Sequence, residues 1–470
     1  MTAFEFLGGS PTAIACVTSR GQTWTYAQID AATARGAQAL QAQGVGPGVP
    51  VAVRVREPLG FLISALSVWR AGGVVVPLDP LAHPSKTQSL LPRVRAKGIV
   101  NTVSDDGLPV WEDGPGGAAL DARVGLVLFT SGSSGPPKAV LLRREGVLAN
   151  VDAILEYLPV KASPRTAVVL PFLYSYALVG QALTTLRAGG TVVLLNDVAF
   201  PPLQVAALRD LNAQGLSAVP TSLRRLAQVA MELPATERPR LAYVASAGAA
   251  LDSATLALVR EAFPGARLFN QYGLTEASPR VSGTDDSVPE FLKGSSGRPL
   301  RNVEVAIRDS EGRDVGPGQE GDIWVRGPSV MMGYLDDPEG TARVLRADGW
   351  LKTGDHGHLG EGGYLFVKGR SDGVVKCAGV RVSLDEVGEV LRRATSPHDV
   401  CVVAVPDDLW GSRLVAFIEG PEEAVARAKA VARELHAAAK PSRYVALEHF
   451  PRTANGKPQL KELQAMAQAL

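Results

Sequence analysis

The chain has 470 residues and is 46% hydrophobic, so it is long enough to bury a large core and to form two or more domains. A formal net charge of +1 argues against a nucleic-acid surface or an acidic membrane as the main partner, because both demand a basic excess. The three cysteines are widely spaced, without a metal or disulfide pattern, which favours a reducing compartment. Neither a signal peptide nor an apolar run of roughly 18 residues is evident. We therefore expect a cytoplasmic protein without integral membrane contact.

Over about the first 300 residues, short apolar runs alternate with amphipathic helical patterns. Helices are predicted at residues 26–43 and 252–262. Buried strands are predicted at residues 49–55, 72–78, 166–172, 190–195 and 240–248. Such alternation is typical of parallel sheets covered by helices.

From about residue 303 the pattern changes to two-residue alternation with Gly and Pro turns, which predicts a small antiparallel barrel or sheet. A turn-rich segment then follows residue 369. Beyond it we predict a helix at 384–393, strands at 400–405 and 413–419, and a long helix at 422–439, together a compact α+β unit. The expected fold is α/β, with a domain at 1–369 that holds two parallel-type sheets and the small β-barrel, and a small mobile domain at 370–470.

The stretch "TSGSSGPPK", residues 130–138, follows an apolar run and is built to wrap a ligand. It is not a Walker A loop, because Lys138 follows a proline and Ala139 takes the place of the metal-binding hydroxyl. Successive Gly and Ser residues can still turn their N–H groups inward around an anion, with hydroxyls and a lysine adding donors. Read alone, the stretch is equally a flexible surface turn.

Three later stretches carry residue types suited to a nucleotide. In "NQYGLTEAS", residues 270–278, a tyrosine can stack on a planar ring and the Thr275–Glu276 pair suits Mg²⁺ and phosphate. Asp355 could accept both hydroxyls of a ribose, and Arg370 could donate to ribose or phosphate oxygens. "RTANGK", residues 452–457, presents a lysine on a glycine turn. Each of these, alone, is also compatible with a solvated turn.

In this order, "TSGSSGPPK", "YGLTE", "TGD", "GRSDGVVKCAGVRV" and "RTANGK" resemble the motif series of the adenylate-forming superfamily, and the resemblance covers nearly the whole chain. This superfamily contains acyl-CoA synthetases, nonribosomal peptide adenylation domains and luciferases. The resemblance implies an enzyme that activates a carboxylic acid with ATP and Mg²⁺ and then passes the acyl group to the thiol of coenzyme A or of a carrier protein's phosphopantetheine. It implies catalytic roles for Lys457, Glu276, Thr275 and Arg370, with Glu276 on the metal.

By the same resemblance, the phosphate loop and Lys138 hold the β- and γ-phosphates, and Tyr272 lies against adenine opposite residues 247–249. Lys457 bridges the carboxylate and the α-phosphate, where a cation offsets the repulsion between two anions. The residues expected to bind the nucleotide are Thr130, Ser131, Gly132, Ser133, Ser134, Gly135, Lys138, Ala247, Gly248, Ala249, Asn270, Gln271, Tyr272, Gly273, Thr275, Asp355, Arg370 and Lys457.

The small domain of the superfamily rotates between the two half-reactions, and Asp372 matches the hinge position. Rotation would withdraw Lys457 and bring the loop at residues 376–382 to the site, where Lys376 and Gly379 lie on the thiol side. Glycine suits a place where backbone must approach a ligand.

The acid is less well specified by the sequence. In "PFLYSYALVG", residues 171–180, Leu173 stands where amino-acid-activating relatives carry an Asp, and a buried ammonium without a carboxylate is costly. Tyr174, Tyr176 and Ala247 either line the acyl pocket or are ordinary core residues. The small side chains at 245–251 suit a roomy, apolar pocket, which favours a fatty or aryl acid.

The leading interpretation is an AMP-forming acyl-CoA synthetase or acyl-carrier-protein ligase. The alternative is a free-standing adenylation protein of a peptide or polyketide pathway that loads a non-α-amino acid onto an acyl or peptidyl carrier protein. A silent nucleotide-binding relative is disfavoured because Lys457, Glu276 and Asp355 are all present. The motifs leave luciferase-like oxygen chemistry open.

Overall fold

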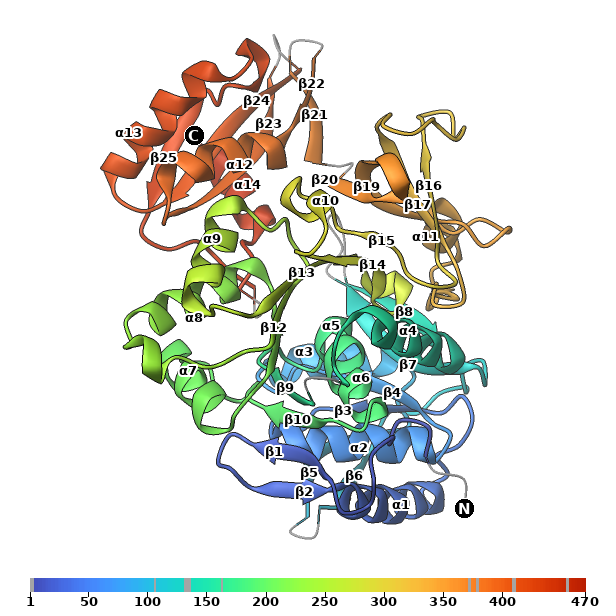
Figure 1. The fold of residues 1–470 in the computed structure, drawn as a ribbon. Coiled ribbons are helices and arrows are strands. Elements are labelled where there is room, and N and C mark those ends of the chain that lie inside the picture. The colour runs from blue at the N-terminus through green and yellow to red at the C-terminus, as the bar shows by residue number, and fades with distance from the viewer. Residues whose placement is uncertain are drawn as a thin grey trace.

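The computed structural model describes residues 4–104, 107–130, 137–161, 164–370, 373–377, 380–407, 411–453 and 456–470. Its β-strands form two large sheets and three smaller ones. In Figure 1 the orange and red C-terminal segment lies at the opposite end of the molecule from the blue N-terminal helices.

The larger sheet has nine strands in the order β15-β14-β13-β12-β11-β9-β10-β1-β2. Its inner pairs, from β13 across to β1, are parallel, and antiparallel strands occupy both edges. The strands are β1 (Ile14–Thr18), β2 (Thr23–Thr25), β9 (Arg165–Val168), β10 (Thr191–Leu194), β11 (Gly215–Ala218), β12 (Tyr243–Ser246), β13 (Arg267–Gly273), β14 (Arg280–Asp285) and β15 (Arg298–Pro299). The predicted parallel sheet is confirmed.

The second sheet has seven strands in the order β18-β8-β7-β4-β3-β5-β6. They are β3 (Pro50–Val53), β4 (Val74–Pro77), β5 (Gly98–Val103), β6 (Pro109–Asp113), β7 (Val124–Thr130), β8 (Lys138–Arg143) and β18 (Gly333–Tyr334). Strands β7 and β8 pair antiparallel, with Thr130 opposite Lys138. The predicted phosphate loop is therefore the connection of a β-hairpin.

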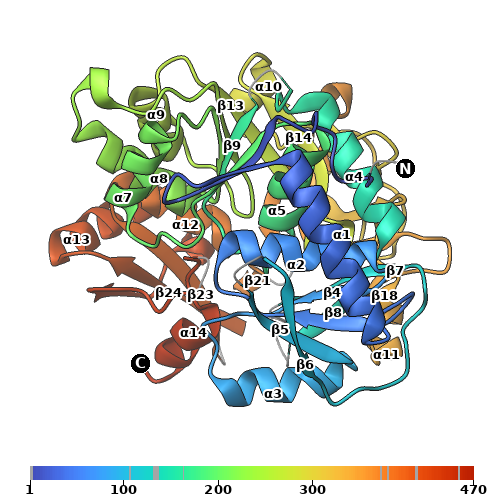
Figure 2. The same ribbon diagram turned by 90° about the horizontal axis from the view of Figure 1, so that it is seen from below.

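Helices α1 (Tyr26–Ala42) and α2 (Pro58–Arg70) lie between the two sheets (Figure 2). Helix α1 begins where expected, because Thr25 and Gln28 form a reciprocal capping box. Helix α2 is buried from Pro58 to Trp69, as its apolar composition on all sides requires. The other helices of this part are α3 (Pro84–Arg93), α4 (Arg144–Tyr157), α5 (Ser175–Ala177), α6 (Thr184–Arg187), α7 (Pro201–Asp210), α8 (Pro220–Met231), α9 (Ser253–Ala262), α10 (Pro289–Leu292) and α11 (Pro338–Val344).

The alternating segment after residue 303 forms a four-stranded antiparallel sheet in the order β16-β17-β19-β20. Its strands are β16 (Glu304–Arg308), β17 (Gly321–Arg326), β19 (Leu351–Leu359) and β20 (Leu365–Arg370). The sheet places the predicted ribose ligand and its arginine on neighbouring strands, since Asp355 pairs with Arg370.

The C-terminal part contains a two-stranded hairpin and a three-stranded sheet with helices. Its elements are β21 (Val374–Cys377), β22 (Val380–Ser383), α12 (Leu384–Thr395), β23 (Asp399–Asp407), β24 (Gly411–Glu419), α13 (Glu422–Val431), β25 (Arg443–Leu447) and α14 (Leu460–Gln468). It has hydrophobic clusters of its own, made only of residues from 375 onward. The domain boundary at 369–372 stays a prediction.

The long helix predicted at 422–439 is wrong in its second half. Helix α13 ends at Val431, and two short 3₁₀ turns follow, at Ala432–Glu434 and Ala437–Ala439. The break lets Leu435 and Ala438 pack on the core of the C-terminal part, so tertiary contacts override the helix propensity of an alanine-rich segment. Within the described ranges, no helix is long and apolar enough to cross a membrane.

Candidate functional site

The carboxylate of Asp355 lies at the centre of a polar cluster on the four-stranded sheet. Its Oδ2 accepts a hydrogen bond from the Tyr272 hydroxyl at 2.5 Å, and its Oδ1 lies 3.5 Å from Nη1 of Arg370. Burial and the adjacent Asp355 charge raise the pKa of Tyr272 well above its usual range, so Tyr272 remains a hydrogen-bond donor. Asp355 thus connects the ring expected to meet adenine with the arginine expected to meet ribose.

Gly354 lies directly beside the guanidinium of Arg370. Gly354 has a φ of +77°, and a Cβ there would lie only 2.8 Å from Nη2 of Arg370. Any side chain at this position would be strained in its backbone and would collide with the guanidinium. The "TGD" motif therefore favours glycine mainly because of the positive φ, and a side chain there would also displace the guanidinium of Arg370.

Lys457 reaches the predicted adenine wall from the far end of the chain. Its Nζ donates a hydrogen bond to the carbonyl oxygen of Gly248, in the 247–249 segment that follows β12. Burial lowers the pKa of Lys457, and the nearby negative charge of Asp355 opposes that shift. Gly248 has a φ of +85°, and a Cβ there would lie 3.5 Å from the lysine Nζ. A lysine near the C-terminus and a glycine near the middle of the chain therefore share one site.

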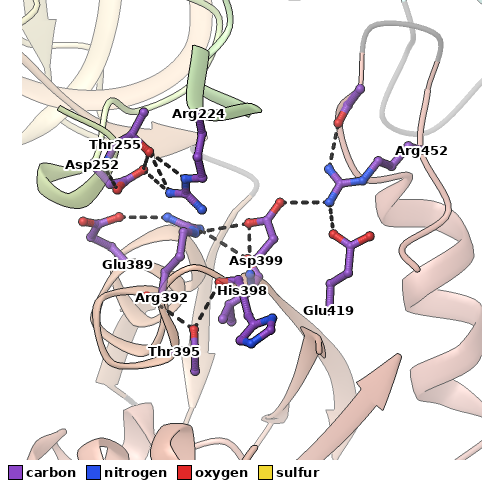
Figure 3. Close-up of polar contacts among 12 residues, drawn as sticks. Arg224, Asp252, Thr255, Glu389, Arg392, Thr395, His398, Asp399, Glu419 and Arg452 are labelled. Carbon is purple, nitrogen blue, oxygen red and sulfur yellow. Dashed lines mark hydrogen bonds and ion pairs between the residues drawn. The ribbon is translucent and has the colours of Figure 1, made fainter. Parts of the chain in front are cut away.

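The turn that carries Lys457 is held by Arg452 (Figure 3). Nη1 of Arg452 donates to the carbonyl oxygen of Gly456 at 2.8 Å. Nη2 pairs with Asp399 at 3.1 Å and with Glu419. These two carboxylates stand directly opposite each other on β23 and β24. The arginine thus neutralises a like-charged cross-strand pair and fixes the lysine turn to the sheet.

The same figure shows where the C-terminal part meets α8 and α9. Arg224 pairs with Asp252 at 2.7 Å, and Arg392 of α12 lies beside them while pairing with Glu389 at 2.8 Å (Figure 3). Burial alone would raise the pKa of Asp252, but Arg224, hydrogen bonds from Thr255 and the charge of Arg392 together lower it. The junction is therefore electrostatically complementary in the arrangement that brings Lys457 to Gly248.

Glu276, the predicted metal ligand, is held by a residue that sequence reasoning missed. The Tyr334 hydroxyl donates to Oε1 of Glu276 at 3.0 Å, and Nζ of Lys138 lies 4.4 Å from the centre of the Tyr334 ring. Strand β18 pairs with β8, which puts Tyr334 beside the start of β8 at Lys138. Nζ of Lys138 also lies 3.9 Å from Asp337. The predicted phosphate-binding lysine and the predicted metal ligand therefore both contact one tyrosine, Tyr334.

The acid-pocket candidates lie at different places around this centre. The Ser175 hydroxyl is 3.5 Å from that of Thr275, and the Tyr176 hydroxyl donates to the carbonyl oxygen of Ala245 at 3.2 Å. Burial and the charge of Asp79 raise the pKa of Tyr174 to about 12. Ala247 is buried. The segment 174–176 thus adjoins both Thr275 and the strand that leads to the adenine wall.

Asn270 and Gln271 are buried and hydrogen-bonded within the fold. Nδ2 of Asn270 donates to the Ser295 carbonyl at 2.9 Å, and Nε2 of Gln271 donates to the Tyr157 hydroxyl at 2.8 Å. Their side chains therefore support Tyr272 and Gly273, which follow them on β13.

Some predicted site residues lie outside the described residues, namely Ser131, Gly132, Ser133, Ser134, Gly135, Asp372 and Gly379. Lys376 lies on β21, paired with residue 381 on β22, but its side chain is likewise outside the description. Their roles stay predictions.

Within the described ranges, no group of three or more His, Cys, Asp and Glu side chains could hold a metal ion. Glu276 is a single carboxylate beside the predicted phosphate lysine. This donor set fits Mg²⁺, which is usually held by one or two carboxylates together with substrate phosphates.

The chain is similar to known AMP-binding enzymes in both sequence and structure. A family model described as AMP-binding enzyme matches residues 4–123 and 121–335, and one described as AMP-binding enzyme C-terminal domain matches 386–457. The chain is 29% identical over 489 residues to 4-coumarate–CoA ligase 3 of Oryza sativa subsp. japonica, covering 95% of this chain and 87% of the relative. It is 27% identical over 496 residues to the medium-chain fatty-acid–CoA ligase of Escherichia coli strain K12, covering 96% and 87%. The crystal structure of ATP-bound MatB from Rhodopseudomonas palustris superposes with a TM-score of 0.86 at 24% identity, covering 100% and 99%.

Proposed function

Because the chain belongs to the family of AMP-binding enzymes, we propose that it transfers the acid it activates with ATP to the thiol of coenzyme A. The protein is an AMP-forming acid–thiol ligase. A carboxylate oxygen attacks the α-phosphorus of ATP, the bond to the β-phosphate oxygen breaks, and pyrophosphate leaves. The thiol then loses its proton and attacks the acyl carbon, forming a thioester and releasing AMP.

The observation that carries this proposal is the position of Lys457. Its Nζ contacts Gly248 at the predicted adenine wall, within the electrostatic influence of Asp355. A cation at this place offsets the repulsion between the attacking carboxylate and the α-phosphate, and a preorganised cation needs no reorganisation during the reaction.

The other side chains bind and orient the nucleotide in this proposal. Asp355 accepts hydrogen bonds from the ribose hydroxyls while Tyr272 and Arg370 hold its carboxylate in place. Lys138 binds the phosphates and Thr275 contacts the α-phosphate. Glu276, oriented by Tyr334, holds Mg²⁺, which when bound neutralises charge on the phosphate oxygens.

For the thioester step we propose that Asp372 acts as the hinge and that the hairpin of β21 and β22 replaces the Lys457 turn at the site, with Lys376 and Gly379 on the thiol side. Rotation of a small domain about a few residues is a known way to reassemble a site between steps. The three cysteines are free and buried, which supports a reducing compartment such as the cytoplasm.

The test is exchange of labelled pyrophosphate into ATP with a broad panel of carboxylic acids. Exchange that depends on one class of acid is expected, and its absence with every acid would refute acid activation. Acyl transfer is then compared between free coenzyme A and a phosphopantetheinylated carrier protein. Transfer only to the carrier would refute coenzyme A as acceptor and favour an assembly-line adenylation protein.

A further inference from the structure

One arginine beside the acid-binding segment is buried without a counter-charge. Arg280 is the first residue of β14, four positions after Glu276, and only 2% of its surface is exposed. Its backbone N–H and carbonyl are both hydrogen-bonded to the side chain of Asn150. The backbone position is therefore well fixed, and the guanidinium is held inside the protein.

No described residue supplies a negative charge to this guanidinium. Its Nε has no hydrogen-bond partner, and within the described ranges no carboxylate forms an ion pair with it. Arg308, the other arginine of the described ranges that is buried, differs because it pairs with Asp314 at 2.8 Å. A buried charge that meets only neutral groups is unfavourable, so this arginine suggests an anion that comes from outside the folded chain.

The neighbouring phenols do not provide the missing charge. The guanidinium lies 4.8 Å from the centre of the Tyr176 ring. Burial raises the pKa of Tyr176 to about 12 and raises that of Tyr157, although the charge of Arg280 opposes both shifts. Both hydroxyls also hydrogen-bond with Arg280, but they stay protonated at neutral pH and so offer it neutral oxygens and no negative charge.

Tyr176 connects Arg280 with the reacting centre. Its hydroxyl donates to the Ala245 carbonyl on β12, and Ser175, the residue before it, lies 3.5 Å from the Thr275 hydroxyl. A Cβ on Gly180 would lie 3.4 Å from both Nη2 of Arg280 and Cδ2 of Tyr176. Gly180 therefore packs closely against both the guanidinium and the ring, and it has no side chain that would crowd them.

The element that carries Gly180 is itself unusual. Residues Leu178–Leu183 form a π-helical turn, a feature that often marks functional sites. Gln181 within this turn is 1% exposed, and neither its Nε2 nor its Oε1 has a hydrogen-bond partner. The turn next to Arg280 thus carries a second buried polar group that the fold leaves unsatisfied.

We propose that the acid activated by this protein carries a second anionic group, such as a distal carboxylate, and that Arg280 is the residue that pairs with it. The proposal rests on the proposed function and refines its substrate class, from an aliphatic or aryl acid to one that ends in a second acid group. The incoming anion supplies the counter-charge that the chain lacks. Since an arginine matches a carboxylate with two parallel N–H donors, pairing also fixes the acid's orientation.

The test compares matched acids in the pyrophosphate exchange assay: adipate with hexanoate, suberate with octanoate, and terephthalate with benzoate. For the wild-type protein, kcat/KM is expected to favour the diacid by roughly 10²-fold or more in at least one pair, because a site built around a polar substrate group strongly rejects analogues that lack it. This comparison needs no variant. Equal or better use of the monoacid in every pair overturns the proposal, whereas no exchange with any acid overturns the proposed function instead.

Variants then assign the preference to Arg280. Arg280→Met is expected to lose the preference for the diacid and to keep or raise its melting temperature, since it leaves no carboxylate unpaired. Arg280→Lys is expected to retain part of the preference. Arg298→Met is the matched control, because Arg298 is exposed and stacks on Tyr364 outside the site. A preserved diacid preference in Arg280→Met, or a large fall in its melting temperature, contradicts the assignment.

Discussion

Replacing Arg452 with methionine tests how the lysine turn is held. The side chains of Arg452, Asp399 and Glu419 are only 14%, 16% and 17% exposed. Removing one partner of a buried ion pair lowers the free energy of unfolding by about 3–5 kcal/mol. Because this cluster is partly exposed to solvent, we expect a loss of about 2–3 kcal/mol. Arg452→Met leaves two carboxylates facing each other across β23 and β24 (Figure 3), so these strands should open more easily.

Hydrogen–deuterium exchange of peptides from β23 and β24 measures this opening. Exchange should accelerate by about 30- to 150-fold, since each 1.4 kcal/mol corresponds to a factor of ten. The double variant Arg452→Met/Glu419→Gln should recover much of the protection, because Asp399 keeps Arg392 at 3.5 Å as a partner. The control is Arg443→Met, which removes an exposed arginine of β25.

The same variant has a consequence for catalysis. Loss of the charged hydrogen bond from Arg452 to Gly456 should lower kcat/KM of adenylation by about tenfold or more, while thioester formation from preformed acyl-adenylate is retained. Unchanged exchange in β23 and β24 would refute the ion-pair argument. Faster exchange with undiminished adenylation would refute the positioning of Lys457 by this turn.

Three further outcomes are expected. Lys457→Ala should slow adenylation by roughly 10²–10³-fold and spare the thioester half-reaction, whereas Lys461→Ala, an exposed lysine of α14, should leave both unchanged; equal loss in both half-reactions would contradict the assignment. In pH profiles, kcat/KM of adenylation should fall on the alkaline side below the usual lysine range, because the lowered pKa of Lys457 means that its proton is lost earlier as pH rises; a decline only in the usual range would count against a buried lysine. Gly354→Ala should raise KM for ATP by displacing Arg370, and an unchanged KM would show that Arg370 does not need its present position.

Many strands and helices of the N-terminal part could be predicted from the sequence. The buried runs at 166–172, 190–195 and 240–248 contain strands β9, β10 and β12 because parallel strands with both faces covered are apolar throughout. Helix α9 begins directly after Asp252, whose carboxylate caps it. Helix α13 is the exception, since alanine-rich sequence predicts a continuous helix while packing of Leu435 ends it.

The site was predictable where a motif is local. Asp355 and Arg370 stand on adjacent, paired strands joined by a short connection, so their meeting follows from the hairpin itself. Tyr334 was missed because it meets Glu276 only through the pairing of β18 with β8, which joins segments almost 200 residues apart. The role of Arg452 was also not predicted, because the motif at residues 452–457 was interpreted through its lysine alone.

By itself, the sequence determined the family and with it the acid-activating chemistry, because the motifs follow one another in the order of the adenylate-forming superfamily, although each motif alone is compatible with a solvated turn. It also determined the parallel sheets, since apolar periodicity decides which segments are buried. Only the tertiary structure decided that Arg280 lies inside the protein beside Tyr176, where no carboxylate of the described residues pairs with it. An isolated arginine after a proline looks solvated in sequence, and its burial depends on strands, a π-helical turn and a tyrosine that only folding brings together.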